Sequence, residues 1–273
     1  MKLLIPFDFS PVSKNAIQQA LNLSIPDGAE IFILHFVQEK EQIQEKELHL
    51  RTFVKGLILP KNVLISAHVV VGDFLNDIGK IAGYHGVDLV VMGTHGVDFL
   101  QKMFGSNSVK IIRNSTVPFI VMQEECEISK INKIVMPYSI ERKSMQVLRI
   151  ITQLSKINQA EIHLLGRVHE DEFEKHQENT GIIMAKKHLI ENNVKHEFVL
   201  KNLSKSEFET CIIDYSKEIK ADLIALTYYS DSLLPIFEKF VQNIIVNSAH
   251  IPVLCVNAQS LSKADSILSF MTS

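Results

Sequence analysis

The sequence carries almost no net charge and contains few cysteines. Its 28 Lys and Arg residues stand against 31 Asp and Glu residues, a net charge of −3, so the basic excess typical of proteins that bind nucleic acid or anionic membranes is missing. Cys126, Cys211 and Cys255 are far apart and odd in number, which indicates a reducing compartment and no disulfide framework. The apolar stretch Met1–Phe7 meets Asp8 at once and is too short for a signal peptide, and no uncharged run is long enough to cross a bilayer. We therefore expect a cytoplasmic protein that binds neither membrane nor nucleic acid.

The motifs of several enzyme classes are also missing. There is no GxxxxGKS or GxxxxGKT loop, no GxSxG and no HExxH, which disfavours a P-loop NTPase, a hydrolase with a serine elbow and a zinc protease. No pair of carboxylates stands out for general acid–base chemistry. The chain has 11 histidines, but their spacing fits no zinc motif, so we expect surface or half-buried imidazoles and no metal site. The second-half histidines concerned are His163, His169, His176, His188 and His196.

What the chain has is a globular composition and an internal repeat. Hydrophobic residues make up 46% and charged residues 22% of 273 residues, enough for one large or two ordinary soluble domains. Similar blocks recur at an offset of 131 residues at first and 134 later, which predicts one unit written twice with a three-residue change in one loop. The paired blocks are Lys2–Pro6 with Lys133–Pro137, Ala29–Ile31 with Ala160–Ile162, Val87–Val90 with Ala221–Ile224, and Val117–Val121 with Ile251–Cys255.

Each unit is predicted to alternate strands and helices. Short apolar and β-branched runs are typical of buried parallel strands, and periodic segments after Ser10-Pro11, at Leu48–Leu57 and at Phe74–Ala82 are typical of helices. The strands are expected near 2–7, 30–37, 63–71, 87–92 and 118–122, and near 133–137, 160–166, 194–200, 221–227 and 252–256. This pattern predicts an α/β fold of two tandem, doubly wound, five-stranded parallel-sheet domains.

We place the two domains at 1–125 and 131–257, joined by the polar segment Glu124–Asn132. The acidic run His169–Glu178 is expected to be the solvated start of a helix. The tail 258–273 has an apolar stripe that suits a terminal helix.

The most informative segment is rich in glycine and follows the predicted fourth strand. Gly93 and Gly96 come after the strand, and Gly105-Ser106-Asn107-Ser108 opens a predicted helix. Glycine allows the backbone to approach an anion closely, and free N–H groups at a helix start favour negative charge. The segment therefore predicts a cradle for phosphate, and it occurs only in the first unit.

Asp8 lies just past the first predicted strand, as Gly93 lies just past the fourth. In a common doubly wound order these two strands are neighbours at the switch point, where ligands bind beyond the carboxyl ends of the strands. Taken alone, Asp8 beside Ser10-Pro11 suits a helix cap. Taken with the glycine segment, it favours a ligand role, in which the carboxylate accepts hydrogen bonds from an amino group or a ribose.

These residues together resemble the nucleotide-binding branch of the universal stress protein family. The family pattern after the fourth strand is Gly, two residues, Gly, nine residues, Gly, and then Ser or Thr. Gly93, Gly96, Gly105 and Ser106 match it, except that eight residues, Val97–Phe104, separate the last two glycines.

Further matches lie outside the glycine segment. Pro6 and Asp8 correspond to the family's opening strand and its adenine-side acid, and Val37 corresponds to the position whose backbone contacts adenine. Gly72 corresponds to a glycine after the third strand. The resemblance covers nearly the whole chain, as two family domains in tandem.

The resemblance implies that the ligand is ATP or a related adenine nucleotide, ADP or AMP, with Mg²⁺ able to bridge the phosphates. The adenine would lie near Asp8 and Val37, the ribose near Gly93, and the phosphates against the glycine segment. The residues that the resemblance assigns to the cofactor are Pro6, Asp8, Val37, Met92, Gly93, His95, Gly96, Gly105, Ser106, Asn107 and Ser108.

The second unit lacks the residues of the cradle. The alignment sets Ser139 against Asp8 and Ser206 against Gly72, Thr227–Ser230 against Gly93–Gly96, and Lys239-Phe240 against Gly105-Ser106. We therefore expect this unit to bind no nucleotide in that mode, with Tyr228 and Tyr229 filling the core where glycines were lost.

The resemblance also implies how the domains associate. Family domains pair through their last strands, so Phe119–Val121 would lie beside Val253–Cys255 in a pseudo-dimer that covers two exposed sheet edges. Two whole chains would then be able to form a homodimer.

Two functions remain open. The first is a stress and signalling module that binds a nucleotide with little or no catalysis, weak ATP hydrolysis at most, the nucleotide ordering the arm Val97–Phe104. The second is a dimeric scaffold of the same fold that binds no nucleotide because the shortened arm spoils the cradle. An enzyme of the wider adenine nucleotide α-hydrolase type would need a second substrate site, which the sequence does not show.

Overall fold

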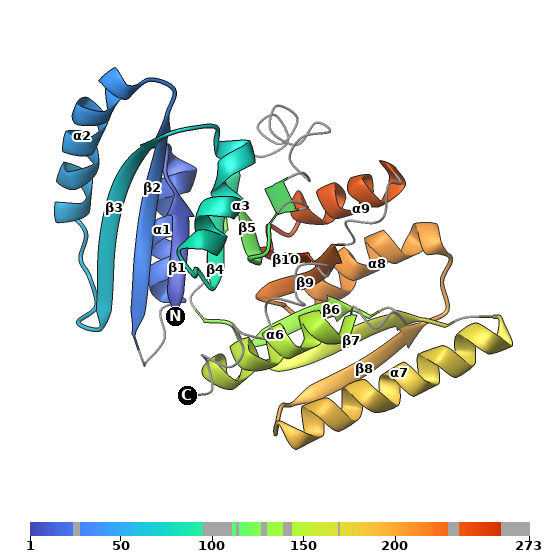
Figure 1. Ribbon diagram of the computed structural model, residues 1–273. Coiled ribbons are helices and arrows are strands. Elements are labelled where there is room, and N and C mark those ends of the chain that lie inside the picture. The colour runs from blue at the N-terminus through green and yellow to red at the C-terminus, as the bar shows by residue number, and fades with distance from the viewer. Residues whose placement is uncertain are drawn as a thin grey trace. The chain divides into compact units, whose positions relative to one another are not determined.

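The computed structural model describes residues 1–23, 28–94, 111–112, 115–126, 130–138, 144–168, 170–228 and 235–257. Met1–Ser129 forms one compact unit and Lys130–Gln259 another, and Figure 1 traces the elements of each. None of the helices within these ranges is long and apolar enough to cross a membrane. The tail 258–273, predicted to pack as a helix, lies outside the described residues.

The first unit is a parallel sheet with helices between its strands. The strands are β1 (Lys2–Pro6), β2 (Ala29–Val37), β3 (Val63–Val71), β4 (Leu89–Thr94) and β5 (Phe119–Gln123), and the helices are α1 (Pro11–Asn22), α2 (Ile43–Lys55) and α3 (Phe74–Tyr84), with a 3-10 turn at Lys40–Gln42. Their order in the sheet is β3-β2-β1-β4-β5, and each neighbouring pair is parallel. Leu3, Leu4 and Ile5 of β1 are buried, as expected for a central strand covered on both faces.

The second unit has the same arrangement. It consists of β6 (Lys133–Pro137), α6 (Ser144–Asn158), β7 (Glu161–Arg167), α7 (Glu172–Glu191), β8 (His196–Lys201), α8 (Lys205–Glu218), β9 (Leu223–Tyr228), α9 (Pro235–Ile245) and β10 (Val253–Asn257). The order is β10-β9-β6-β7-β8, again with parallel neighbours. The predicted α/β class with a parallel central sheet is confirmed. The pairing of the last strands of the two units stays a prediction.

The three-residue change between the units lies in a helix, so the prediction of a changed loop is wrong. Asp73 caps α3 and Ser204 caps α8, each through a side chain that accepts a backbone N–H. These caps are still at the offset of 131, whereas the residues that end the two helices, His85 and Ile219, are at 134. Helix α8 has 14 residues and α3 has 11. Ser206 therefore lies inside α8 and is not the counterpart of Gly72.

Three further expectations need correction. Strand β4 continues to Thr94, so Gly93 lies within the strand, where it pairs with Met122 of β5, and not beyond it. Helix α2 begins at Ile43, before the expected Leu48, because its first turn is polar and gives no apolar period. The acidic run His169–Glu178 is also not wholly solvated, since Glu178 is buried.

Candidate functional site

The carboxyl ends of β1 and β4 lie side by side in the first unit (Figure 1). Leu3 pairs with Leu89 and Leu4 with Val90, while β2 and β3 lie on the other side of β1. The strand order therefore reverses between β1 and β4, at the predicted switch point. This edge is where a doubly wound sheet binds ligands, and it brings Asp8 and Gly93 to one place.

The carboxylate of Asp8 is exposed and held by Ser10. Its Oδ1 accepts a hydrogen bond of 3.0 Å from the backbone N–H of Ser10 and another from the Ser10 hydroxyl. The Ser10 hydroxyl oxygen in turn accepts the backbone N–H of Ser13 at 3.2 Å, so Ser10, and not Asp8, is the N-cap of α1. Asp8 is thus fixed in direction at the switch point without being used as the cap.

Phe9 adopts a left-handed backbone conformation between these two residues. Its φ is 65°, which is uncommon for a bulky residue. The ring packs edge-on against Phe7 and His35, with centroids 4.9 Å away in both cases. This packing offsets the backbone strain and turns Asp8 towards solvent.

A cluster of aromatic rings packs against the loop between β1 and α1. Phe7 is buried and stacks on Phe53 of α2 at 4.6 Å. Nδ1 of His35 lies 2.6 Å from the carbonyl oxygen of Phe7, and because a carbonyl can only accept, this nitrogen carries the proton. The sequence reasoning missed this cluster, although Phe7, Phe9 and His35 stand beside the assigned residues.

Removing the Ser10 hydroxyl should loosen the start of α1. We expect Ser10→Ala to lower the local stability of this helix by about 1 kcal/mol, the usual cost of losing an N-cap, and to remove the hydrogen bond that the Ser10 hydroxyl donates to Asp8. Amide hydrogen exchange of the first turn, at Ser13, measures the effect. Ser10→Thr keeps a capping hydroxyl and is the control; equal protection in wild type and Ser10→Ala would contradict the assignment of the cap.

The close packing of α1 on β4 explains why residue 93 is a glycine. A Cβ at this position would lie 2.5 Å from Cγ2 and 2.8 Å from the carbonyl oxygen of Val12 in α1. Only glycine therefore allows the first turn of α1 to pack directly on β4. The same close approach fixes the position of Asp8 relative to the end of β4, because Asp8 and Val12 flank the cap of the same helix.

The other described candidates lie in or directly after the strands of the first unit. Val37 ends β2 and is buried, and its carbonyl oxygen accepts the N–H of Gly72 at 3.1 Å. A Cβ at Gly72 would lie 2.9 Å from Oδ2 of Asp77, so this glycine serves the tight turn into α3. Pro6 ends β1, and Met92 is buried within β4.

The predicted phosphate side of the site stays a prediction. The residues assigned to it lie outside the described residues: His95, Gly96, Gly105, Ser106, Asn107 and Ser108. The described chain before this gap ends at Thr94, whose hydroxyl donates to the carbonyl oxygen of Met122 at 3.4 Å.

The corresponding edge of the second unit is filled by larger side chains. Tyr228 ends β9 at the place of Thr94 and is among the largest fully buried side chains, which confirms its expected role in the core; Tyr229 lies outside the described residues. Tyr138 stands where the first unit has Phe7, and a Cβ at Gly181 of α7 would lie 2.6 Å from its hydroxyl. Burial, and then the charge of Glu178, raise the pKa of Tyr138 to about 12, so it stays a neutral phenol.

Fold and site together define a doubly wound α/β protein with a candidate ligand site at the switch point of its first unit. Residues 1–123, nearly the whole of that unit, match the model of the universal stress protein family. The first unit of the chain is therefore similar to the domain of that family.

Individual relatives and solved structures show the same similarity. Universal stress protein MJ0531 of Methanocaldococcus jannaschii is 27% identical over 139 residues, which cover 45% of this chain and 82% of the relative. A universal stress protein from Archaeoglobus fulgidus DSM 4304 covers 94% of this chain and 96% of its own, with a TM-score of 0.71 and 15% identity, so the fold is shared over both units. A universal stress protein from Archaeoglobus fulgidus in complex with dAMP covers 48% of this chain and all of its own, at 15% identity and a TM-score of 0.37, a similarity too low to place a nucleotide here.

Proposed function

We propose that the first unit binds an adenine nucleotide at the carboxyl ends of β1 and β4 and acts as a stress and signalling module with little or no catalysis. The observation that supports this most is the exposed carboxylate of Asp8, oriented by Ser10 at the switch point of the sheet. The match of this same unit to the model of the universal stress protein family agrees with it.

The chemistry of Asp8 favours adenine. A carboxylate only accepts hydrogen bonds, so it suits the amino group of adenine or a ribose hydroxyl, and it repels the keto oxygen that inosine nucleotides carry instead. A site built to pair with an amino group discriminates strongly against an analogue that lacks it. The phosphates would reach the segment that follows Thr94, with Gly105 and Ser106 at the predicted helix start and Mg²⁺ as their counter-ion.

Calorimetric titration of the purified protein with ATP, ADP and AMP, each with and without Mg²⁺, tests the proposal. We expect ATP to bind and ITP to bind at least tenfold more weakly, because the keto oxygen faces Asp8. Phosphate release measured in parallel should stay close to that of ATP alone in buffer.

Two variants locate the site. Asp8→Ala removes the adenine-side acceptor, and Gly105→Leu fills the predicted cradle without adding a charge that would itself attract phosphate. Each should weaken ATP binding at least tenfold, or about 1.4 kcal/mol. Glu30→Ala is the control, since Glu30 is an acid at the amino end of β2, opposite the proposed site, where it pairs with Lys2 at 3.7 Å.

The outcomes separate the two functions. Binding that Asp8→Ala and Gly105→Leu weaken, and Glu30→Ala leaves unchanged, supports the nucleotide module. No heat with any nucleotide would overturn it in favour of a scaffold that binds none. Equal binding by all variants would mean that the nucleotide lies elsewhere.

A further inference from the structure

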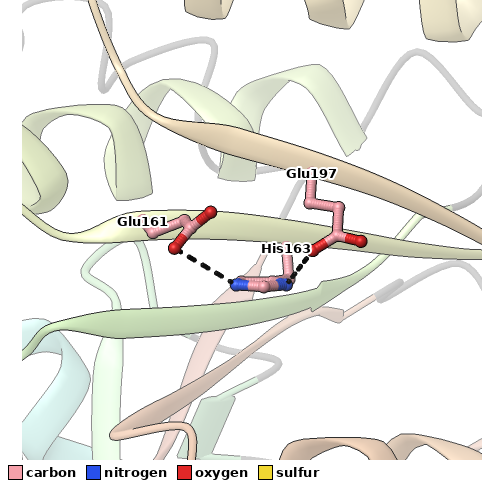
Figure 2. Close-up of side chains that lie close together, drawn as sticks. All are labelled: Glu161, His163 and Glu197. Carbon is pink, nitrogen blue, oxygen red and sulfur yellow. Dashed lines mark ion pairs between the residues drawn. The ribbon is translucent and has the colours of Figure 1, made fainter. Parts of the chain in front are cut away.

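Strand pairing in the second unit gathers three residues that are distant in the sequence. Glu161 and His163 are two residues apart on β7 and so face the same side of the sheet. Glu197 of β8 is the direct cross-strand partner of His163. One ligand atom from each of the three lies within 4.8 Å of the others, and Figure 2 shows the imidazole between the two carboxylates.

The imidazole is buried, and only one of its two nitrogens has a hydrogen-bond partner among the described residues. His163 is 3% exposed. Its Nδ1 lies 2.8 Å from the hydroxyl of Tyr215 on α8 and 3.3 Å from Oε2 of Glu197. Its Nε2 is buried and has no hydrogen-bond partner among the residues that the structure describes, although the Glu161 carboxylate is 3.8 Å away. A buried polar atom without a partner is costly and calls for an explanation.

The neighbours of the ring determine where its proton lies. The Tyr215 hydroxyl and the Glu197 carboxylate can both accept a hydrogen bond from Nδ1–H. With the proton on Nδ1, Nε2 presents a lone pair to the Glu161 carboxylate. Two electron-rich atoms then face each other with no donor between them. Metal-binding histidines are held in this way, with one ring N–H donated to an outer acceptor and the other nitrogen free for the ion.

We propose that Glu161, His163 and Glu197 bind a divalent first-row transition-metal ion such as Zn²⁺, with Tyr215 as a positioning residue. Zinc–nitrogen and zinc–oxygen bonds are about 2.1 Å long, so one ion can span the 3.8 Å between Nε2 of His163 and Oε2 of Glu161. Glu197 lies at Nδ1 and would have to turn towards the ion, leaving the Nδ1 proton to the Tyr215 hydroxyl at 2.8 Å. Its side chain is 56% exposed and that of Glu161 is 37% exposed, so both carboxylates can adjust while the buried ring stays fixed. One imidazole with two carboxylates suits Zn²⁺ and its neighbours rather than a soft ion such as Cu(I).

Two lysines near the cluster are each held by another group. Lys133 pairs in the sheet with Glu161, but its ammonium group donates to the carbonyl oxygen of Ile219 at 3.1 Å. The ammonium of Lys201 lies over the ring of Tyr215, 5.8 Å from its centroid. A bound ion would tie β7 to β8 and, through Tyr215, to α8. The unit that lost the glycine cradle would in this way have gained a different ligand.

Titration of chelator-treated protein with Zn²⁺, followed by calorimetry, tests this site. We expect one tight Zn²⁺ ion per chain, and Co²⁺ should give visible absorption bands that disappear in His163→Gln. Glu161→Gln and Glu197→Gln should each weaken Zn²⁺ binding at least tenfold. Tyr215→Phe keeps the ring but removes the hydroxyl, and it should weaken binding by about 10- to 100-fold.

His196→Gln is the matched control, because His196 lies on the same strand as Glu197 but outside the cluster, with Nδ1 bonded to the carbonyl oxygen of Val194 at 2.8 Å. This variant should bind Zn²⁺ as the wild type does. The partly exposed Glu197→Gln keeps the test valid if His163→Gln fails to fold. Absence of Zn²⁺ binding in the wild type would overturn the proposal. Equal affinity in wild type, Glu197→Gln and Tyr215→Phe would overturn it as adventitious binding by other histidines.

Discussion

Gly93→Ala should destabilise the first unit by about 3 kcal/mol, at the upper end of the usual cost of overpacking a core. The added Cβ would lie 2.5 Å from Cγ2 and 2.8 Å from the backbone oxygen of Val12. The Val12 side chain can turn away from the new Cβ, but the Val12 carbonyl can move only if α1 shifts away from β4. Amide hydrogen exchange in β1 and β4 measures the local free energy of opening, which should fall.

Two comparisons make the Gly93 prediction specific. Val12→Ala in the Gly93→Ala background removes the contact with Cγ2 and leaves the contact with the carbonyl, so it should restore only part of the loss. Gly56→Ala is the control, because a Cβ at Gly56 meets nothing closer than the carbonyl oxygen of Phe53 at 3.4 Å. If Gly93→Ala opened no more readily than Gly56→Ala, the close approach of α1 to β4 would be wrong.

Asn247→Leu should cost the second unit about 3 kcal/mol, because it leaves buried backbone groups without partners. Asn247 is 1% exposed and closes the turn between α9 and β10 with four hydrogen bonds. Its Nδ2 donates to the carbonyl oxygens of Ile244 and Ile251, and its Oδ1 accepts the N–H groups of Ala249 and Ile251. Leucine has a similar size but can make none of these bonds.

The neighbouring residue supplies the control for Asn247. Ser248 is exposed, so Ser248→Ala should change the denaturant midpoint of the second unit little. Asn247→Asp keeps the two accepted bonds but loses both donated ones, and its effect should fall between the other two variants. A midpoint for Asn247→Leu equal to that of Ser248→Ala would contradict the role of this turn.

Much of the fold could be predicted from local sequence. Apolar runs with turn residues between them located the strands, and β3 and β6 have the predicted limits. The adjacency of β1 and β4 followed from the doubly wound class. The ends of β4 and the start of α2 were missed because hydrogen bonding decides them: β4 continues through Gly93 and Thr94 because β5 pairs with both.

The site was harder to predict, because contacts between segments distant in the sequence form it. Glycine was taken as a sign of ligand approach, but at Gly93 the close neighbour is a helix turn, which no single-sequence pattern reveals. Glu178 was expected to be solvated because it is charged, yet it lies on a buried part of α7. Glu161, His163 and Glu197 match no motif, since cross-strand pairing and not spacing brings them together.

The number of nucleotides bound per chain tests the central claim most directly. We expect one ATP per chain in the wild type, with binding weakened by Asp8→Ala and unchanged by Ser139→Ala, the aligned position of the second unit. A titration that gave no bound ATP, or two per chain with both unaffected by Asp8→Ala, would contradict it.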